Sequence, residues 1–306
     1  MQYTSVMNRQ SLSDLMDKVK HDPVGLVESA EARYQGEIEN VCQAVVEHKK
    51  KVILLCGPSS AGKTTSAKKL IDTLRADGHK VNRVSLDDFY KNKEELPLWN
   101  DGSINFESIE GLDLSLFHSQ MQTLFEKGEA DFPVFNFKKP EVRETFRLYY
   151  DDDTYTIVEG IHALNPKISE SLNGLPCCRV YVSVHTDFVH ADGSIKLKGR
   201  TLRLARRTIR DKTHRNTDTE TTFQMWDYIL KGERLYIQPY RKDVDFHIDT
   251  THAYEPFIFA RHVQNLLGDN QQEGLAALLR SSFEDLPSMD EALVPRNSLL
   301  QEFIGK

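Results

Sequence analysis

The amino-acid sequence predicts an α/β protein built on a doubly wound parallel sheet. Two observations carry this prediction: short, continuously apolar segments recur along the chain, and most are followed by a segment with apolar residues at helical spacing. The clearest apolar segment is 52–56, Val-Ile-Leu-Leu-Cys. A strand that is buried on both faces has no polar side, so such segments are typical of parallel sheets covered by helices. Their alternation with helices indicates the doubly wound arrangement.

The individual elements follow from the same two patterns. Apolar residues at helical spacing between 11 and 50 are interrupted at Pro23, which predicts two helices there. The strands are expected at 52–56, 81–86, 154–158, 178–184 and 244–248. One helix is expected with Ala67, Leu70, Ile71 and Leu74 on its buried face, and the others at 113–127, 200–212, 218–231 and 255–267.

Length and composition bound the domain organisation. The chain has 306 residues, 39% of them hydrophobic, and a formal net charge of −7. This length suits one large domain or two modest ones, and either can bury a core without disulfides. We expect a nucleotide-binding domain at 51–268, a helical extension at 1–50, and a C-terminal tail at 269–306 that docks on the body or on a partner subunit.

Composition also limits the location and the partners. The four cysteines show no metal-ligand spacing, which favours a reducing compartment. No apolar run approaches the ~20 residues needed to span a bilayer, and the N-terminus lacks the apolar core of a signal peptide. We therefore expect a cytoplasmic protein without a membrane partner. The acidic balance argues against nucleic acid as a partner.

The strongest motif stands between the first expected strand and its helix. Residues 57–64 read Gly-Pro-Ser-Ser-Ala-Gly-Lys-Thr, which matches the phosphate-loop pattern G-x-x-x-x-G-K-[ST] in its strand-loop-helix context. Glycines let backbone N–H groups turn toward an anion, and the helix that follows adds the positive end of its dipole. Lys63 supplies a charge for the β- and γ-phosphates, and the Thr64 hydroxyl can ligate Mg²⁺. The fold class is therefore that of the P-loop NTPases, with a helical lid and helical terminal additions.

Acidic residues follow two other expected strands. Asp87 and Asp88 come directly after one strand, and Glu159 ends another. Because ligands of open α/β sheets bind at the carboxyl ends of the strands, we expect at least one of the two aspartates to accept a proton or hold metal. Glu159 is the candidate for fixing Mg²⁺. His162 is expected to be structural or a loop contact rather than a catalyst.

Basic residues gather between 200 and 215 in this otherwise acidic chain. On a helix, Leu202, Ala205 and Ile209 would line one face, and four arginines would cluster on another: Arg203, Arg206, Arg207 and Arg210. Such a cluster fits either a solvated face paired with acids or a lid that brings guanidinium groups onto transferring phosphates. We favour the lid for the cluster as a whole.

Together these motifs resemble the uridine kinase and phosphoribulokinase family of P-loop kinases, and are most similar to its bacterial uridine-kinase-like members. The resemblance spans about 50–268 and is carried by the phosphate loop and four further segments in the family's order. These are Ser-Leu-Asp-Asp-Phe-Tyr at 85–90, Phe-Pro-Val-Phe-Asn-Phe at 132–137, Val-Glu-Gly-Ile-His-Ala-Leu-Asn at 158–165 and Arg-Arg-Thr-Ile-Arg-Asp at 206–211.

The resemblance implies roles for individual residues. Catalysis would fall to Asp87 as the base, with Lys63, Arg207 and Arg210 on the phosphates. ATP, with GTP as the alternative donor, would be bound by Gly57, Ser59, Ser60, Ala61, Gly62, Lys63, Thr64, Thr65 and Arg215. The acceptor would meet Asp87, Tyr90, Glu107, Phe135 and Phe137, with Glu107 holding ribose hydroxyls. Mg²⁺ would be held by Thr64, Asp87 and Glu159.

The sequence departs from the family where the base would be read. Phe135-Asn136-Phe137 leads to Lys138-Lys139-Pro140 without the His that contacts the pyrimidine in uridine kinases, and Thr217 replaces a lid arginine. We expect a kinase that phosphorylates the 5′-hydroxyl of a uridine- or cytidine-like nucleoside. The alternatives are a kinase of a sugar phosphate or pantothenate-like alcohol, and, in a different class, a nucleotide-dependent switch or RNA-associated NTPase. A homo-oligomer is compatible with the apolar tail.

Overall fold

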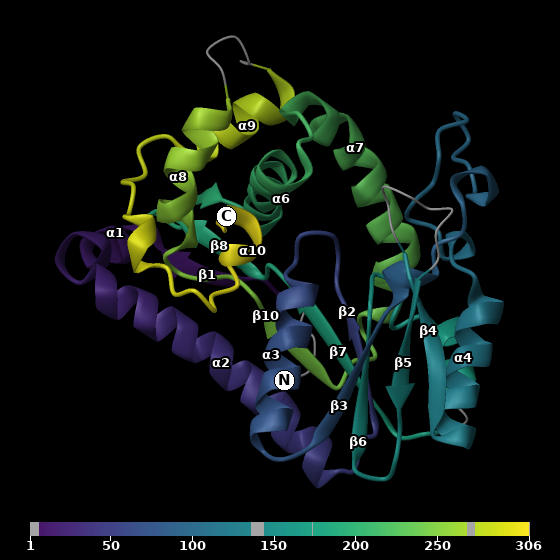
Figure 1. Cartoon of the computed structure of the whole chain (residues 1–306). Helices are drawn as coiled ribbons and strands as arrows, with labels where there is room; N and C mark the ends of the chain where they lie inside the picture. The colour runs from purple at the N-terminus through teal and green to yellow at the C-terminus, as the bar shows by residue number, and fades with distance from the viewer. Residues whose placement is uncertain (1–5, 136–143, 173, 268–272, 306) are drawn as a thin grey trace.

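A parallel sheet with helices on both faces forms the centre of the molecule, as predicted (Figure 1). The computed structural model describes residues 6–135, 144–172, 174–267 and 273–305. All neighbouring strands of the sheet run parallel. Their order is β10 (Phe246–Asp249), β7 (Cys177–Ser183), β2 (Val52–Cys56), β6 (Thr154–Glu159) and β3 (Lys80–Ser85). The carboxyl ends of these strands therefore meet at one edge, where the sequence places its acidic residues.

The central strand β2 packs against two hydrophobic clusters. Ile53 and Leu55 point into one cluster, and Val52, Leu54 and Cys56 point into the other. This period of two follows from strand geometry and explains why all five residues are apolar. The first cluster contains residues of α2 (Pro23–Glu47), α3 (Lys63–Ala76), α6 (Gly199–Arg215), α7 (Thr219–Gly232), α8 (Glu255–Leu266) and α9 (Gly274–Phe283). The second contains residues of α4 (Leu114–Lys127) and α5 (Pro166–Ser169).

Local sequence accounts for the helix boundaries. The break predicted at Pro23 separates α1 (Leu12–His21) from α2, and the Asp22 carboxylate between them accepts a hydrogen bond from the Gly25 N–H at 3.0 Å. Likewise, α4 begins at the cap Asp113 and ends at Gly128, which has φ 79°. The central strands and the helices given ranges in the sequence analysis lie within three residues of the expected bounds.

Two small sheets were not expected from the sequence. One consists of β1 (Asn8–Ser11), β8 (Thr186–Val189) and β9 (Ile195–Leu197), and the other is a hairpin of β4 (Glu129–Val134) and β5 (Glu144–Tyr149). Strand β1 is four residues long and wholly polar, so it carries none of the apolar pattern that reveals a buried strand. It forms because it pairs in parallel with β8, far away in sequence.

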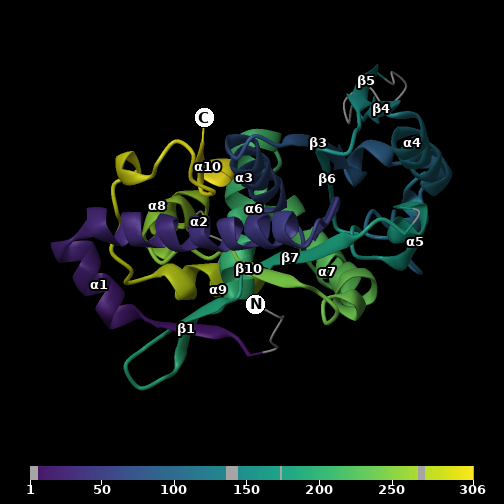
Figure 2. The ribbon, with the colours of Figure 1, turned by 90° about the horizontal axis from the view of Figure 1, so that it is seen from below.

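Both terminal additions pack onto the body near α3. Helix α2 runs along α3 on one side (Figure 2). Near its end the tail forms the short helix α10 (Gln301–Ile304), which lies against α6. Phe303 of α10 and the preceding Leu299 and Leu300 are buried in the first cluster. The four cysteines are free thiols. Among the described residues, none of the helices has the length and apolar character needed to cross a membrane.

Candidate active site

The phosphate loop joins β2 to α3 at the carboxyl edge of the sheet. Its turn places Ser60 and Gly62 in the left-handed region, with φ 61° and 85°. Gly57 has no room for a side chain, because a Cβ there would lie 2.3 Å from the carbonyl oxygen of Val182 on β7. The loop therefore turns tightly against the neighbouring strand, which is the geometry on which the predicted phosphate site depends.

Side chains close around this loop. The Lys63 ammonium donates a hydrogen bond to the carbonyl oxygen of Pro58 at 3.1 Å, so it folds back across the loop. The Arg207 guanidinium donates to the Ser59 hydroxyl at 2.7 Å. The Ser60 hydroxyl is buried and has no hydrogen-bond partner within the described part of the chain. Two cationic groups and a hydroxyl that could donate a further hydrogen bond therefore lie at the loop, and this combination suits an anionic ligand.

Asp87 and Asp88 occupy the helical turn that follows β3, and they have different environments. The Asp88 carboxylate accepts a hydrogen bond from the Phe135 N–H at 3.0 Å and so fixes the chain after β4. Among the described residues, none forms such a bond with the Asp87 carboxylate, and Asp87 is exposed to solvent at the site. Its pKa is raised, first because surrounding protein limits the water around the carboxylate and then because Glu159 repels its charge, while Lys63 opposes the shift.

Glu159 lies at the carboxyl end of β6, between the strands that carry the phosphate loop and Asp87. In the sheet register it lies opposite Leu55 of β2 and Ser85 of β3. Its side chain is 3% exposed, and one carboxylate oxygen accepts a hydrogen bond from Arg83 at 2.6 Å. Within the residues that the structure describes, no side chain forms a hydrogen bond with the other carboxylate oxygen. Glu159 is thus held rigidly at the position expected for a metal-positioning acid.

The residues at this edge fit a magnesium ion. Asp87 and Glu159 are close enough to repel each other, and the exposed Thr64 stands in the first turn of α3. These groups offer only oxygen atoms, as Mg²⁺ prefers, and a divalent cation would relieve the repulsion between the two carboxylates. No cluster of three or more His, Cys, Asp or Glu side chains suited to a metal occurs within the described ranges. Mg²⁺ at such a site would be held by one or two carboxylates together with phosphates and water.

A third carboxylate, Glu107, faces the same cations. Burial raises the pKa of Glu107 to about 7, although Arg207 and Lys63 lower it. The side chain packs so closely on α7 that a Cβ on Gly232 would lie 2.2 Å from the Cβ of Glu107. The acid predicted to grip the acceptor therefore lies within the electrostatic field of the phosphate loop.

Two of the aromatic residues predicted to meet the acceptor lie near each other. The Tyr90 hydroxyl donates a hydrogen bond to the carbonyl oxygen of Phe106 at 2.8 Å, and the ring centroids of Tyr90 and Phe135 are 6.5 Å apart. Burial, followed by repulsion from Asp87, raises the pKa of Tyr90, so this side chain stays neutral. Phe137 lies outside the described residues, as do Lys138, Lys139 and Arg143.

His162 is buried close to this region. The ring is 1% exposed, lies 6.1 Å from the Tyr236 ring, and makes no hydrogen bond of good geometry within the described residues. Burial lowers the pKa of His162 to about 4, although the backbone of Glu107 and Ser108 lies near enough to oppose this shift. The imidazole is therefore neutral at pH 7.

Three arginines of α6 converge on one buried acid. Asp211 is within 3.2 Å of Arg207, 2.8 Å of Arg210 and 3.7 Å of Arg215. Burial lowers the pKa of Arg207 to about 10, and Asp211 offsets part of this effect. Since one carboxylate balances three guanidinium groups, the set keeps positive charge beside the phosphate loop.

The prediction of a single arginine lid face is wrong for Arg203 and Arg206. Arg206 is fully buried and forms two bonds with Glu255, at 2.5 and 2.8 Å. Arg203 bonds Glu233 at 2.5 Å beneath the Trp226 ring. Both pairs hold α6 to the body, because a buried guanidinium needs an acid partner. Every nitrogen of the Arg206 guanidinium is engaged in these and two further bonds to Thr250, so Arg206 is not available for a ligand.

Two residues of the C-terminal tail reach the phosphate site without having been predicted. The Thr65 hydroxyl donates a hydrogen bond to Glu302 at 2.6 Å. A Cβ on Gly62 would lie 2.5 Å from a methyl group of Leu299. Nothing local in the sequence indicates these contacts, since they join positions more than 230 residues apart.

The loop, the acids at the ends of the adjacent strands and the arginines of α6 define a nucleotide-dependent phosphotransferase. The chain belongs to the phosphoribulokinase/uridine kinase family, whose model matches residues 52–254. Family membership makes the protein a kinase and confirms the resemblance drawn from the motifs.

Relatives with curated names are distant in sequence. The uridine kinase of Lactobacillus johnsonii is 25% identical over 195 residues, covering 63% of this chain and 83% of that protein. The uridine kinase of Deinococcus deserti is 24% identical over 206 residues, covering 67% and 90%. A provisionally named fructose transport system kinase from Silicibacter has a solved structure that matches 69% of this chain and 98% of its own, with TM-score 0.51 and 17% identity. The last likeness supports the fold alone.

Proposed function

We propose that this protein transfers the γ-phosphate of ATP to a primary hydroxyl, the 5′-hydroxyl of a nucleoside. One observation supports this most directly: the sheet order β2-β6-β3 brings the phosphate loop after β2 and Asp87 after β3 to the same edge. Lys63 lowers the pKa of both Asp87 and Glu107, so an acceptor held by the two acids would face the phosphate loop. The switch or RNA-associated alternative is not retained, because the chain belongs to a family of kinases. Absence of a nucleic-acid partner stays a prediction.

In the proposed reaction the acceptor oxygen attacks the γ-phosphorus in line with the bond to the β–γ bridging oxygen. That bond breaks, ADP departs, and the hydroxyl proton passes to Asp87. The raised pKa of Asp87 suits this role, because a carboxylate of ordinary pKa is a weaker base. Thr64, Asp87 and Glu159 would hold Mg²⁺, which would supply positive charge to balance that of the phosphates.

The remaining residues position the two substrates. Lys63 and the loop backbone hold the β- and γ-phosphates, and Arg207 is already aimed at the loop through its bond to Ser59. Arg210 and Arg215 extend the positive charge outward from Asp211. Glu107 accepts hydrogen bonds from the sugar hydroxyls, with Tyr90 and Phe135 beside it.

The identity of the acceptor is the most specific part of the proposal. Curated relatives carry the name uridine kinase, which favours a uridine- or cytidine-like nucleoside. The segment after Phe137, where the sequence lacks the expected His, leaves a sugar phosphate or a pantothenate-like alcohol as the alternative acceptor. GTP in place of ATP is the corresponding alternative for the donor.

An ATP-consumption assay tests the proposal. ADP release would be followed with Mg²⁺ against ribonucleosides, deoxyribonucleosides, sugar phosphates and pantothenate, and saturable turnover is expected with uridine or cytidine. Saturation by a non-nucleoside alcohol alone would favour the alternative acceptor, and ATP hydrolysis indifferent to every acceptor would refute the proposal.

The adjacent aspartates provide a matched pair of variants. We expect Asp87→Asn to lower turnover about 10²- to 10⁴-fold. Asp88→Asn keeps an oxygen that can accept the Phe135 N–H, so it should lose far less. Near-native turnover by Asp87→Asn with the correct acceptor would show that the base is another group.

A further inference from the structure

The tail segment 294–305 forms part of the wall of the phosphate site. Leu299 packs on Gly62 inside the loop, and Glu302 accepts the hydrogen bond of Thr65, the third residue of α3. Phe303 anchors the segment in the core, with its buried ring 5.1 Å from the Arg206 guanidinium of α6. Figure 2 shows α10 beside both α3 and α6. A ligand in the loop would therefore lie next to this tail.

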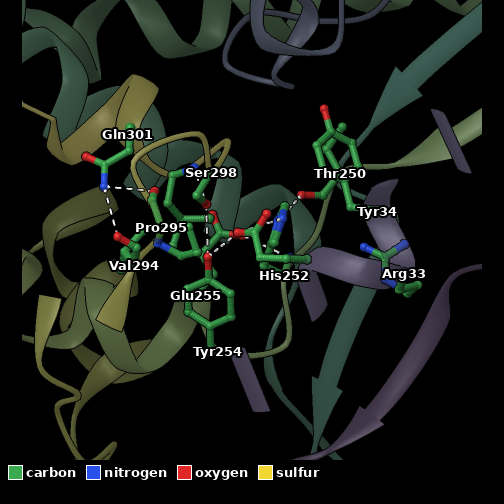
Figure 3. A network of polar contacts seen from close by, with 12 residues as sticks. Arg33, Tyr34, Thr250, His252, Tyr254, Glu255, Val294, Pro295, Ser298 and Gln301 are labelled. Atoms are coloured by element: carbon green, nitrogen blue, oxygen red, sulfur yellow. Dashed lines mark hydrogen bonds and ion pairs between the residues drawn. The ribbon is translucent and has the colours of Figure 1, made fainter. Parts of the chain in front are cut away.

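A buried polar network holds the segment in place (Figure 3). The Tyr254 hydroxyl donates to Glu31 of α2 at 2.6 Å and lies 2.9 Å from the Ser298 hydroxyl. Within the segment, the Gln301 amide donates to the carbonyl oxygens of Val294 and Pro295 at 3.3 and 3.2 Å. Ser298 and Leu299 are almost fully buried, so Glu302 is presented by a rigid support rather than by a loose end.

A cavity of about 400 Å³ opens between α3 and this segment. Thr65 and Glu302 line it, as do Lys68 and Arg296. Its volume is within the range of small-molecule sites. It begins at the first turn of α3, and it runs along that helix toward Ala76. The part of a bound nucleotide that extends out of the loop on this side would fit in this cavity.

The charge of Glu302 decides which part of a nucleotide it can face. A carboxylate accepts hydrogen bonds but cannot donate them, and it repels phosphate. The groups of a nucleoside triphosphate that donate are the ribose hydroxyls and the amino group of the base. Glu302 can therefore meet the nucleoside end of the donor, while Lys63 and Arg207 take the phosphate end.

We infer that the tail segment 294–305 completes the donor site and that Glu302 is a specificity-determining residue, accepting a hydrogen bond from the nucleoside moiety of the phosphate donor. The inference rests on the proposed use of a nucleoside triphosphate. It adds the residue that selects the donor, and it is independent of the identity of the acceptor.

Calorimetric titration with Mg²⁺ and without acceptor tests the inference. Wild type, Glu302→Gln and the control Glu284→Gln, which removes the same charge from an exposed position after α9, would each be titrated with ATP, 2′-deoxy-ATP and inosine triphosphate. The deoxy analogue lacks one ribose donor, and the inosine analogue lacks the amino group. These two arms distinguish the sources of the hydrogen bond.

We expect wild type to bind ATP about tenfold more tightly than one of the two analogues, and Glu302→Gln to lose that preference while binding ATP about tenfold more weakly. Glu284→Gln should match wild type. Glu302→Asp, which keeps the charge but shortens its reach, should also lose the preference and serves if the Gln variant does not fold.

Three results would overturn the inference. Equal affinities in wild type and Glu302→Gln would exclude a role in donor binding, and uniform weakening with the preference intact would show a merely structural role. Tighter ATP binding by Glu302→Gln would show that the carboxylate competes with the phosphates. Failure of wild type to bind any nucleotide would instead refute the proposed function itself, and the inference with it.

Discussion

Substitution of Arg206 should mainly lower the stability of the protein, whereas substitution of the adjacent Arg207 should mainly lower its catalytic turnover. Arg206 is 0% exposed and makes four hydrogen bonds, two to Glu255 and two to Thr250. Replacing it by Met keeps much of the volume but leaves the buried Glu255 carboxylate without its cation. Arg207 points instead to the phosphate loop, and its acid partner Asp211 keeps Arg210 at 2.8 Å.

The size of the effect follows from this difference. Removing one partner of a buried ion pair costs about 3–5 kcal/mol, so we expect Arg206→Met to lower the free energy of unfolding by about 4 kcal/mol. Arg207→Met leaves no unpaired carboxylate and should cost about 1 kcal/mol. The double variant Arg206→Met with Glu255→Met removes both charges and should recover more than half of the loss.

Urea unfolding followed by circular dichroism at pH 7 measures these changes, and the kinase assay at 20 °C measures turnover of the folded fraction. Arg206→Met should keep turnover within a few fold, whereas Arg207→Met should lose about a hundredfold or more. The reasoning fails if Arg206→Met unfolds within about 1 kcal/mol of wild type, or if Arg207→Met is the less stable of the two.

Three further predictions concern the site. Burial raises the pKa of Glu107 from 4.5 to about 7, so ionisation of this side chain destabilises the fold as pH rises through that window. Glu107→Gln should therefore be up to about 3 kcal/mol more stable than wild type at pH 8 and equal to it at pH 4. Thermal melts across this pH range measure the difference, and a difference that does not change with pH would contradict the proposed cause. Glu159→Gln should raise the Mg²⁺ concentration for half-maximal turnover by about 10- to 100-fold. An unchanged Mg²⁺ titration would show that Glu159 is not part of the metal site. Gly57→Ala should abolish ATP binding in calorimetry, because the new Cβ would lie 2.3 Å from the Val182 carbonyl oxygen. The control Gly36→Ala lies in α2, where a Cβ would meet nothing within 4 Å. This control should bind ATP normally and gain up to about 1 kcal/mol in stability.

Local patterns were sufficient to predict the fold and the centre of the candidate site. The phosphate loop is read from eight consecutive residues, because its glycines and its lysine act within one turn of backbone. The strand ends at Asp87 and Glu159 are visible because apolar segments stop there, and parallel strands bring their ends to one edge. These inferences need no knowledge of which distant residues meet.

Roles that depend on distant partners could not be predicted. Arg206 and Arg207 are neighbours of the same type on one helix, and only the position of Glu255 in space separates a structural from a site residue. Glu302 is one of several acids in the C-terminal tail, and its contact with Thr65 has no counterpart in sequence spacing. The polar strand β1 was missed for the same reason, since its pairing with β8 creates it.

The packing of Leu299 on Gly62 has a consequence for the chain during its synthesis. At about 5–20 residues per second, a ribosome adds Leu299 roughly 10 to 50 seconds after it has finished the phosphate loop. Throughout this interval the apolar faces of α2 and α3 lack their final cover. The nascent chain therefore contains the complete phosphate loop before the active site can form. During this stage its uncovered apolar faces expose it most to aggregation.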